Sequence, residues 1–215
     1  MIRQFKLIKA ALFMGAVLLA ACAAAADFSA DTVTQFGSAS ITGKIYRRGS
    51  MIRQDTIMGP NKSTIIIRPD KKVVWIINPA LKRYSEMPYN PKVADVSVLA
   101  NEKELSKFAV KKKLGSEKVN GYDCEKFELT FKDKQANKST IWLAKKLQFP
   151  IKTQSQTPNG VVTSQCKNIK ASTPDKKLFE LPTGYKKVSP RELGGAQPVP
   201  APKPGPKPPA PRPKK

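Results

Sequence analysis

The sequence predicts a mainly β protein of the α+β class, with about ten antiparallel strands and one or two helices. Short alternating or β-branched segments recur along the chain, and turn-forming residues separate them at short intervals. Only residues 93–110 carry apolar spacing that fits a helical face, so we expect a helix there that covers an apolar face of the sheet. The short connections favour an antiparallel meander.

The centre of this pattern is the segment 63–87. Its apolar runs 65–67 and 73–77 flank the sequence Arg68-Pro69-Asp70-Lys71-Lys72, in which proline fixes φ and aspartate tolerates turn geometry. The run 73–77 is apolar on both of its faces, whereas a strand with one face in water should alternate. A helix, another sheet or an apolar ligand is therefore needed to cover its second face.

Further strands are predicted on both sides of this hairpin. Asn120-Gly121 is a strong two-residue hairpin signal between two of them. The predicted strands outside the central hairpin are 38–46, 51–58, 81–87, 111–118, 122–132, 139–144, 151–156 and 161–170.

The two ends of the chain differ in composition from the predicted domain at 27–188. Residues 1–26 combine a basic start, an apolar run and a small-residue stretch, which is typical of a bacterial secretory signal peptide. Residues 189–215 hold ten of the 19 prolines, mixed with lysine, alanine and glycine. We expect this Pro/Lys-rich tail to be disordered, because it cannot bury a core.

The signal peptide could be cleaved at either of two sites. The sequence Leu19-Ala20-Ala21-Cys22 resembles a lipobox, in which Cys22 would be lipidated and anchor the protein to the outer membrane. The small residues just before Asp27 equally suit ordinary signal peptidase, and Cys22 would then be removed.

Either outcome leaves the pair Cys124 and Cys166. In the oxidising periplasm these would form a disulfide between neighbouring strands. The loop it closes, about 43 residues, corresponds to a stabilisation of up to about 4 kcal/mol. The alternative is a pair of buried free thiols.

Charge and composition limit the function classes. The chain has 39 basic and 16 acidic residues, a net charge of +23, and no histidine. The missing histidine removes the commonest general base and metal ligand, and no nucleophile–base pair or acidic dyad stands out, so we predict no catalytic site, metal or cofactor. The basic residues are spread out without a recognition motif. This favours an anionic membrane surface or envelope polymer as partner over nucleic acid.

Several motifs, taken in order, resemble the LolA/LolB-like superfamily of periplasmic lipoprotein carriers, and in particular its outer-membrane lipoprotein-sorting-protein-like branch. The motifs lie at 67–75, 84–86, 121–127, 142–144, 149–152 and 179–185. The resemblance implies a curled antiparallel sheet, an unclosed β-barrel, whose concave face is lined by helices. It also implies an apolar cavity for lipid or the acyl chain of a lipoprotein. We expect the protein to be a monomer.

Candidate residues for that cavity are apolar side chains of the central strands and one tryptophan further on. They are Ile65, Ile67, Val74, Trp75, Ile76 and Trp142. Each could instead be ordinary core packing. The carriers also place an arginine in the cavity, for which Arg48, Arg53, Arg68 and Arg83 are candidates. The alternative function is a structural or sensor module of the envelope that acts through its basic surface and its tail.

Overall fold

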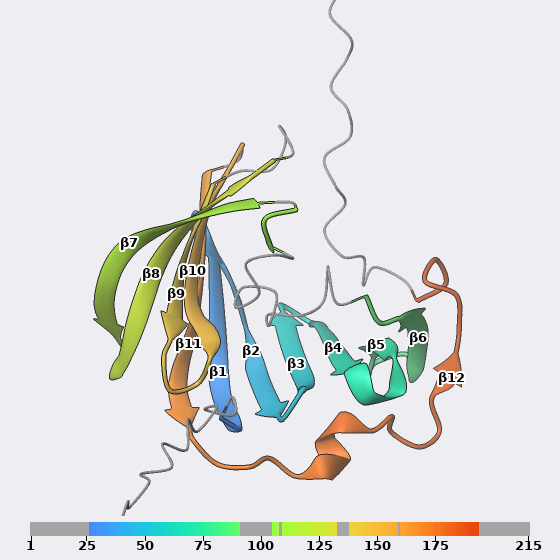
Figure 1. The fold of residues 1–215 in the computed structure, drawn as a ribbon. Helices are drawn as coiled ribbons and strands as arrows, with labels where there is room; N and C mark the ends of the chain where they lie inside the picture. The colour runs from blue at the N-terminus through green and yellow to red at the C-terminus, as the bar shows by residue number, and fades with distance from the viewer. Residues whose placement is uncertain (1–25, 91–104, 108, 133–137, 159, 194–215) are drawn as a thin grey trace, which may run out of the picture.

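The computed structural model describes residues 26–90, 105–107, 109–132, 138–158 and 160–193. They form one twelve-stranded sheet in the order β12-β6-β5-β4-β3-β2-β1-β11-β10-β9-β8-β7 (Figure 1). The strands of the first meander are β1 (Phe28–Phe36), β2 (Ala39–Arg48), β3 (Met51–Met58), β4 (Asn61–Arg68), β5 (Val73–Asn78) and β6 (Arg83–Pro88). Those of the second are β7 (Ala109–Val119), β8 (Tyr122–Phe131), β9 (Ser139–Ala144), β10 (Phe149–Thr157) and β11 (Gly160–Lys170), and β12 (Lys186–Lys187) follows.

Two meanders are joined into this sheet by one long-range pairing. Within each meander the neighbouring strands pair antiparallel in chain order, and β11 then pairs antiparallel with β1. The terminal strands β7 and β12 are not paired with each other, so the sheet curls without closing. This confirms the predicted open, antiparallel β architecture. The two strands beyond the predicted ten are β1 and the short β12.

Local turn chemistry acts as the sequence predicts. Asn120 and Gly121 both have positive φ, of 47° and 82°, which suits the tight turn between β7 and β8. Between β4 and β5 the predicted turn contains the 3-10 helix η1 (Pro69–Lys71), with proline at its start. Lys72 then adopts a left-handed conformation with φ of 56° and returns the chain into β5.

The main core lies inside the curl. One cluster of buried side chains combines Phe28, Ile45 and Ile52 of β1–β3 with Ile151 and Cys166 of β10 and β11. Side chains from distant strands of one sheet pack together in this way only if the sheet bends around them. We call the side of the sheet that carries this cluster the concave face.

The other face of the sheet is partly covered by the C-terminal strap, which we define as residues 171–187. It contains the 3-10 helix η3 (Lys176–Phe179) and, in Figure 1, runs below the strands from the end of β11 to β12. Phe179 is fully buried against Ile66, Trp75 and Ile77. The strap thus covers one of the two apolar faces of β5.

The predicted helix at 93–110 is only partly within the described residues. Residues 91–104 and 108 lie outside them. Ala109 and Val110 begin β7 and pair with Phe131 and Thr130, so the predicted helix end is wrong. Pairing with β8 overrides the local apolar spacing at these positions. No helix in the described part of the chain is long and apolar enough to cross a membrane.

The predicted disulfide is not present. Cys124 and Cys166 are both free and buried. They lie on β8 and β11, which are separated by β9 and β10, so the expected placement on neighbouring strands is wrong. Burial raises the pKa of the Cys166 thiol to about 12, and burial also raises the pKa of Cys124. The alternative of two buried thiols describes this structure.

Residues 1–25 and 194–215 lie outside the described residues, so the signal peptide, the lipidation of Cys22 and most of the tail remain predictions. The fold itself extends past residue 188. Leu193 is buried, and the Asn78 side-chain amide lies 3.5 Å from the Leu193 carbonyl oxygen, to which it donates.

Candidate functional site

Four of the six predicted cavity residues form an apolar patch on β4 and β5. In the ladder Ile65 lies opposite Ile76, and Ile67 lies opposite Val74. Paired residues share a face, and Ile67 also packs against the main core, so the patch is on the concave face. We call Ile65, Ile67, Val74 and Ile76 the concave patch. The structure brings these four residues together on one face, and their role in lining a cavity stays a prediction.

A polar group lies at the border of the concave patch. Ser85 of β6 pairs with Ile76 and is only 1% exposed. Its hydroxyl is the one buried side-chain polar atom in the described part of the chain that has no hydrogen-bond partner. A buried polar atom without a partner costs about 1–3 kcal/mol, so it normally has a reason to be there. A bound polar group would satisfy it.

The two tryptophans do not belong to this patch. Trp75 lies opposite Ile66, on the other face of the sheet, under the strap. Its indole N–H donates to Glu86 at 2.9 Å, and the ammonium of Lys71 lies 5.4 Å from the ring centroid.

Trp142 lies far along the sheet on β9. Its indole N–H donates to Glu117 at 2.8 Å, and the ammonium groups of Lys126 and Lys152 lie 4.9 and 4.3 Å from its ring centroid. Trp75 therefore belongs to the cluster under the strap, whereas Trp142 is buried in the main core cluster, away from β4 and β5.

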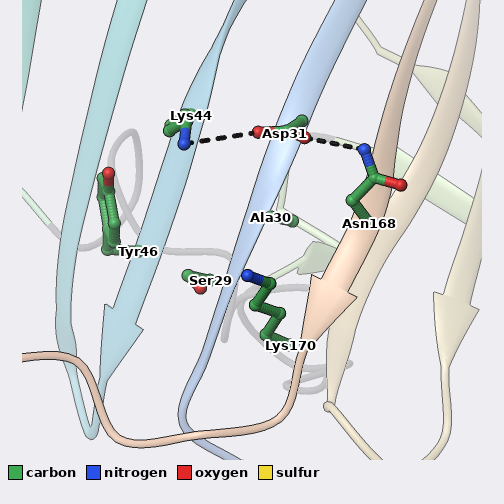
Figure 2. A pocket seen from close by; sticks show the side chains of 7 residues that line it. All are labelled: Ser29, Ala30, Asp31, Lys44, Tyr46, Asn168 and Lys170. Atoms are coloured by element: carbon green, nitrogen blue, oxygen red, sulfur yellow. Dashed lines mark hydrogen bonds and ion pairs between the residues drawn. The ribbon is translucent and has the colours of Figure 1, made fainter.

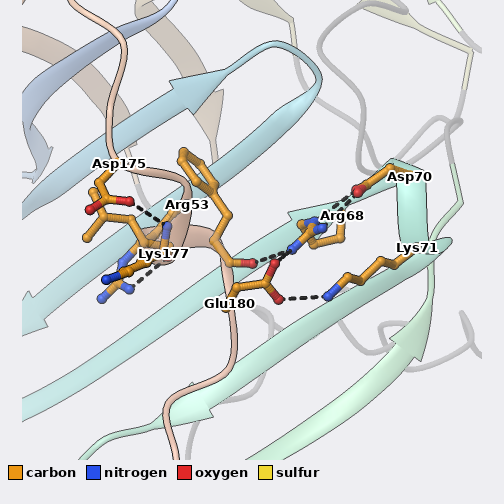
Figure 3. A network of polar contacts seen from close by, with 9 residues as sticks. Arg53, Arg68, Asp70, Lys71, Asp175, Lys177 and Glu180 are labelled. Atoms are coloured by element: carbon orange, nitrogen blue, oxygen red, sulfur yellow. Dashed lines mark hydrogen bonds and ion pairs between the residues drawn. The ribbon is translucent and has the colours of Figure 1, made fainter.

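A buried arginine fastens the strap to the sheet (Figure 3). Arg68 is 2% exposed and binds Asp70 through two hydrogen bonds of 2.8 and 2.7 Å. It also donates to the Phe179 carbonyl oxygen at 2.8 Å and to Glu180 at 2.7 Å. Lys71 donates to the second oxygen of Glu180 at 2.7 Å. We call these five residues the strap clasp.

The clasp joins two of the motifs that carry the superfamily resemblance, 67–75 and 179–185. Its charges hold one another in the ionised state. The hydrogen bonds from Arg68 lower the pKa of Asp70 to about 2, and those from Lys71 and Arg68 lower the pKa of Glu180. Its role is therefore to close one face of β5, and Arg68 is not free to hold a ligand.

The other arginine candidates also lie outside the concave patch. Arg48 donates to the Pro174 carbonyl oxygen and Arg53 to that of Leu178, both in the strap, while Arg83 is exposed. The arginine that does share the concave face is Arg47, which pairs with Phe28 and Ile52.

Arg47 is not among the residues identified from the sequence. Its position two residues after the apolar Ile45 on β2 could have shown that both side chains lie on the same face of the sheet. Arg47 is buried and donates to the Leu147 and Gln148 carbonyl oxygens at 3.0 and 3.1 Å. Its guanidinium carbon lies 5.7 Å from the Phe149 ring centroid. Arg47 thus connects the first meander to the turn between β9 and β10.

Two cavities lie on the opposite face, over β11, β1 and β2, and the first of them is mainly polar. The first has a volume of about 390 Å³ and is lined by Ser29, Ala30, Asp31, Lys44, Tyr46, Asn168 and Lys170 (Figure 2). The second, of about 510 Å³, shares Asp31, Lys44 and Asn168 with it and extends to Ile57. A third, of about 350 Å³, lies near Leu105 and Lys132. None of the six predicted cavity residues lines any of the three.

No group of three or more Cys, Asp or Glu side chains in the described ranges is placed to hold a metal ion.

Sequence comparison assigns the family. The model of a domain of unknown function, DUF4412, matches residues 26–148, more than half of the chain. The protein belongs to the DUF4412 family. No curated protein sequence matches this DUF4412 chain significantly.

Solved structures resemble this DUF4412 protein in fold at low identity. An uncharacterized conserved protein from Thermus thermophilus is 10% identical with a TM-score of 0.57, over 78% of this chain and 92% of the other. A chain of the Pseudomonas aeruginosa MucA/MucB complex is 13% identical with a TM-score of 0.50, over 74% of this chain and 56% of the other. The DUF4412 chain therefore spans little more than half of that second protein.

The superfamily predicted from the sequence is also represented among the similar structures. A LolA superfamily protein from Nitrosomonas europaea is 12% identical with a TM-score of 0.35, over 73% of this chain and 90% of the other. The shared fold itself is supported by the two higher-scoring structures.

Proposed function

We propose that this DUF4412 protein is a non-enzymatic protein of the bacterial cell envelope that binds a lipid, or the acyl chain of a lipoprotein, on its concave patch. It would act in lipid or lipoprotein trafficking, in the periplasm or at the periplasmic face of the outer membrane. The observation that carries this proposal is the concave patch itself, four apolar side chains in register beside the unpartnered Ser85 hydroxyl.

The chemistry of the patch suits an acyl chain. Binding of such a chain would come from removing apolar surface from water, about 25 cal/mol per Å² before the entropic cost of association. The Ser85 hydroxyl could donate to a carbonyl or carboxylate oxygen at the head of the chain. This would convert the unpartnered polar atom into an orienting contact, which is how mostly apolar sites commonly fix a ligand.

The two faces of β5 differ in a way that supports a site on one of them. The face that carries Trp75 is closed by Phe179 and fastened by Arg68. The concave patch has no comparable clasp among the described residues; its β4 members Ile65 and Ile67 keep intermediate exposure, whereas Val74 and Ile76 are buried.

Binding of a fluorescent long-chain fatty acid to the full chain tests the proposal. Ile65→Trp should weaken binding about tenfold or more by filling the patch, since each 1.4 kcal/mol corresponds to a factor of ten. Leu81→Trp is the matched control, because Leu81 is 49% exposed in the turn between β5 and β6. Equal affinity of both variants and the wild type would exclude the concave patch as the site.

The second candidate function is a structural or sensor module that acts through its surface. A net charge of +23 and a tail with only basic charges from residue 196 onward favour an anionic envelope polymer as its partner. Deleting residues 196–215 should then weaken co-sedimentation with cell-wall or outer-membrane fragments at low salt, whereas an inert tail would leave it unchanged. The complex of MucB with MucA makes a protein partner for this fold a related candidate.

A further inference from the structure

The polar cavity over β11, β1 and β2 brings hydrogen-bond donors together on the face opposite the concave patch. Ser29 lies between Tyr46 of β2 and Lys170 of β11 in the ladder, and Asp31 lies beside Lys44. Three neighbouring strands thus present two hydroxyl groups and two ammonium groups to one space of about 390 Å³ (Figure 2). This volume falls within the range of ordinary ligand sites.

The one carboxylate of this cavity already has partners. Asn168 donates to Asp31 at 2.8 Å, and the ammonium of Lys44 lies 3.8 Å from the other oxygen of Asp31. In Figure 2 these two side chains lie on either side of Asp31. The carboxylate therefore adds little negative charge that a ligand would have to overcome.

The remaining cations are free to meet an anion. Neither Lys170 nor Lys167 forms an ion pair with any acid in the described part of the chain. Lys167 lies opposite Asp31 in the ladder and lines the adjoining cavity of about 510 Å³. The second acid of that cavity, Asp55, is held by Arg53 at 3.0 Å and Thr64 at 2.7 Å. The joined cavities are thus net positive.

We propose that this cavity is a binding site for a phosphomonoester group. Lysine ammonium groups bind phosphate as point charges, and a phosphomonoester carries up to two negative charges, so it gains more from several cations than a carboxylate does. Phosphate offers several strong acceptor oxygens, which match the hydroxyl and ammonium donors here. The adjoining cavity, which reaches Val33 and Ile57, has room for the organic part of the ligand.

This site is independent of the acyl-chain proposal, because the concave patch lies on the other face. The phosphomonoester could belong to a soluble molecule or to a lipid headgroup. Two probes distinguish these sources: glucose 6-phosphate in solution, measured by calorimetry, and vesicles of phosphatidylcholine with phosphatidic acid, measured by sedimentation. Glucose and pure phosphatidylcholine vesicles are the controls for the phosphate group.

Variants of the full chain locate the binding. Lys170→Gln should weaken binding of whichever probe binds the wild-type protein about tenfold, as expected for loss of a hydrogen bond to a charged group. Tyr46→Phe, which removes only a hydroxyl, should weaken it by a smaller factor. Lys112→Gln on the edge strand β7 removes the same charge elsewhere and should leave binding unchanged. Circular dichroism of each variant establishes that it is folded.

Binding of either phosphate probe, with loss in Lys170→Gln and not in Lys112→Gln, supports the site and identifies the source. Failure of both probes to bind above their phosphate-free controls would overturn it. An equal effect of the two lysine variants would also overturn it, because binding would then follow net charge alone.

Discussion

Replacing Arg68 with methionine should detach the strap from the sheet. Methionine keeps most of the apolar stem but removes four hydrogen bonds, two to Asp70 and one each to Phe179 and Glu180. The buried Phe179 carbonyl oxygen then loses the guanidinium donor, which costs about 1–3 kcal/mol. The side chains of Asp70 and Glu180 are 49% and 41% exposed, so each can rehydrate, and we assign each lost pair at most about 1 kcal/mol.

The expected total is a loss of about 3 kcal/mol in the free energy of unfolding, or a fall in Tm of roughly 10 °C for a chain of this size. Urea unfolding followed by tryptophan fluorescence measures it, since Trp75 lies under the strap. Arg83→Met is the matched control: Arg83 is exposed at the start of β6, and its loss should cost less than about 0.5 kcal/mol. A loss below about 1 kcal/mol for Arg68→Met would refute the clasp as the strap's main attachment.

Four further results are expected. Folding lowers the pKa of Asp70 from 3.8 to about 2, so its contribution to stability is complete above about pH 4 and is lost as the pH falls toward 2. The difference in the free energy of unfolding between wild type and Asp70→Asn should therefore narrow over that interval. A constant difference would contradict this. Gly43→Ala should destabilise the fold by about 2 kcal/mol or more in urea unfolding, since the new methyl group would overlap the carbonyl oxygen of Asp55; an unchanged midpoint would contradict this. Cys124 and Cys166 should react with iodoacetamide slowly in the native protein and rapidly in urea, because both are buried and burial raises their pKa values, whereas unreactive cysteines in urea would indicate a disulfide. If the lipobox is used, Cys22→Ser should release the protein from the membrane fraction; a soluble wild type that begins at Asp27 would exclude lipidation.

Local chemistry accounts for the parts of the fold that the sequence predicted well. Most strand positions and the turn at Asn120-Gly121 follow from side-chain alternation and from residues that tolerate positive φ. The two-sided apolar character of 73–77 predicted that an additional apolar group must cover the second face of that strand. The strap supplies such a cover through Phe179, more than a hundred residues further along the chain.

Long-range pairing explains what the sequence could not predict. Whether Cys124 and Cys166 are adjacent depends on the order of β8 to β11 in the sheet, which no local pattern encodes. The cavity candidates included Trp75 together with Val74 and Ile76, although alternation along a strand already places Trp75 on the opposite face. The register with Ile66 places it under the strap. The pairing of Arg68 with Glu180 likewise becomes visible only when the two motifs that contain them meet.

Native mass spectrometry of the full chain, purified from the envelope of cells that produce it, tests the acyl-chain proposal most directly. The proposal predicts an added mass of an acyl-containing lipid that is lost on denaturation, which distinguishes it from covalent acylation at Cys22. The same lipid should be absent from Ile65→Trp and present in Leu81→Trp. A wild-type protein that carries no releasable lipid, or an Ile65→Trp variant that retains it, would contradict the proposal.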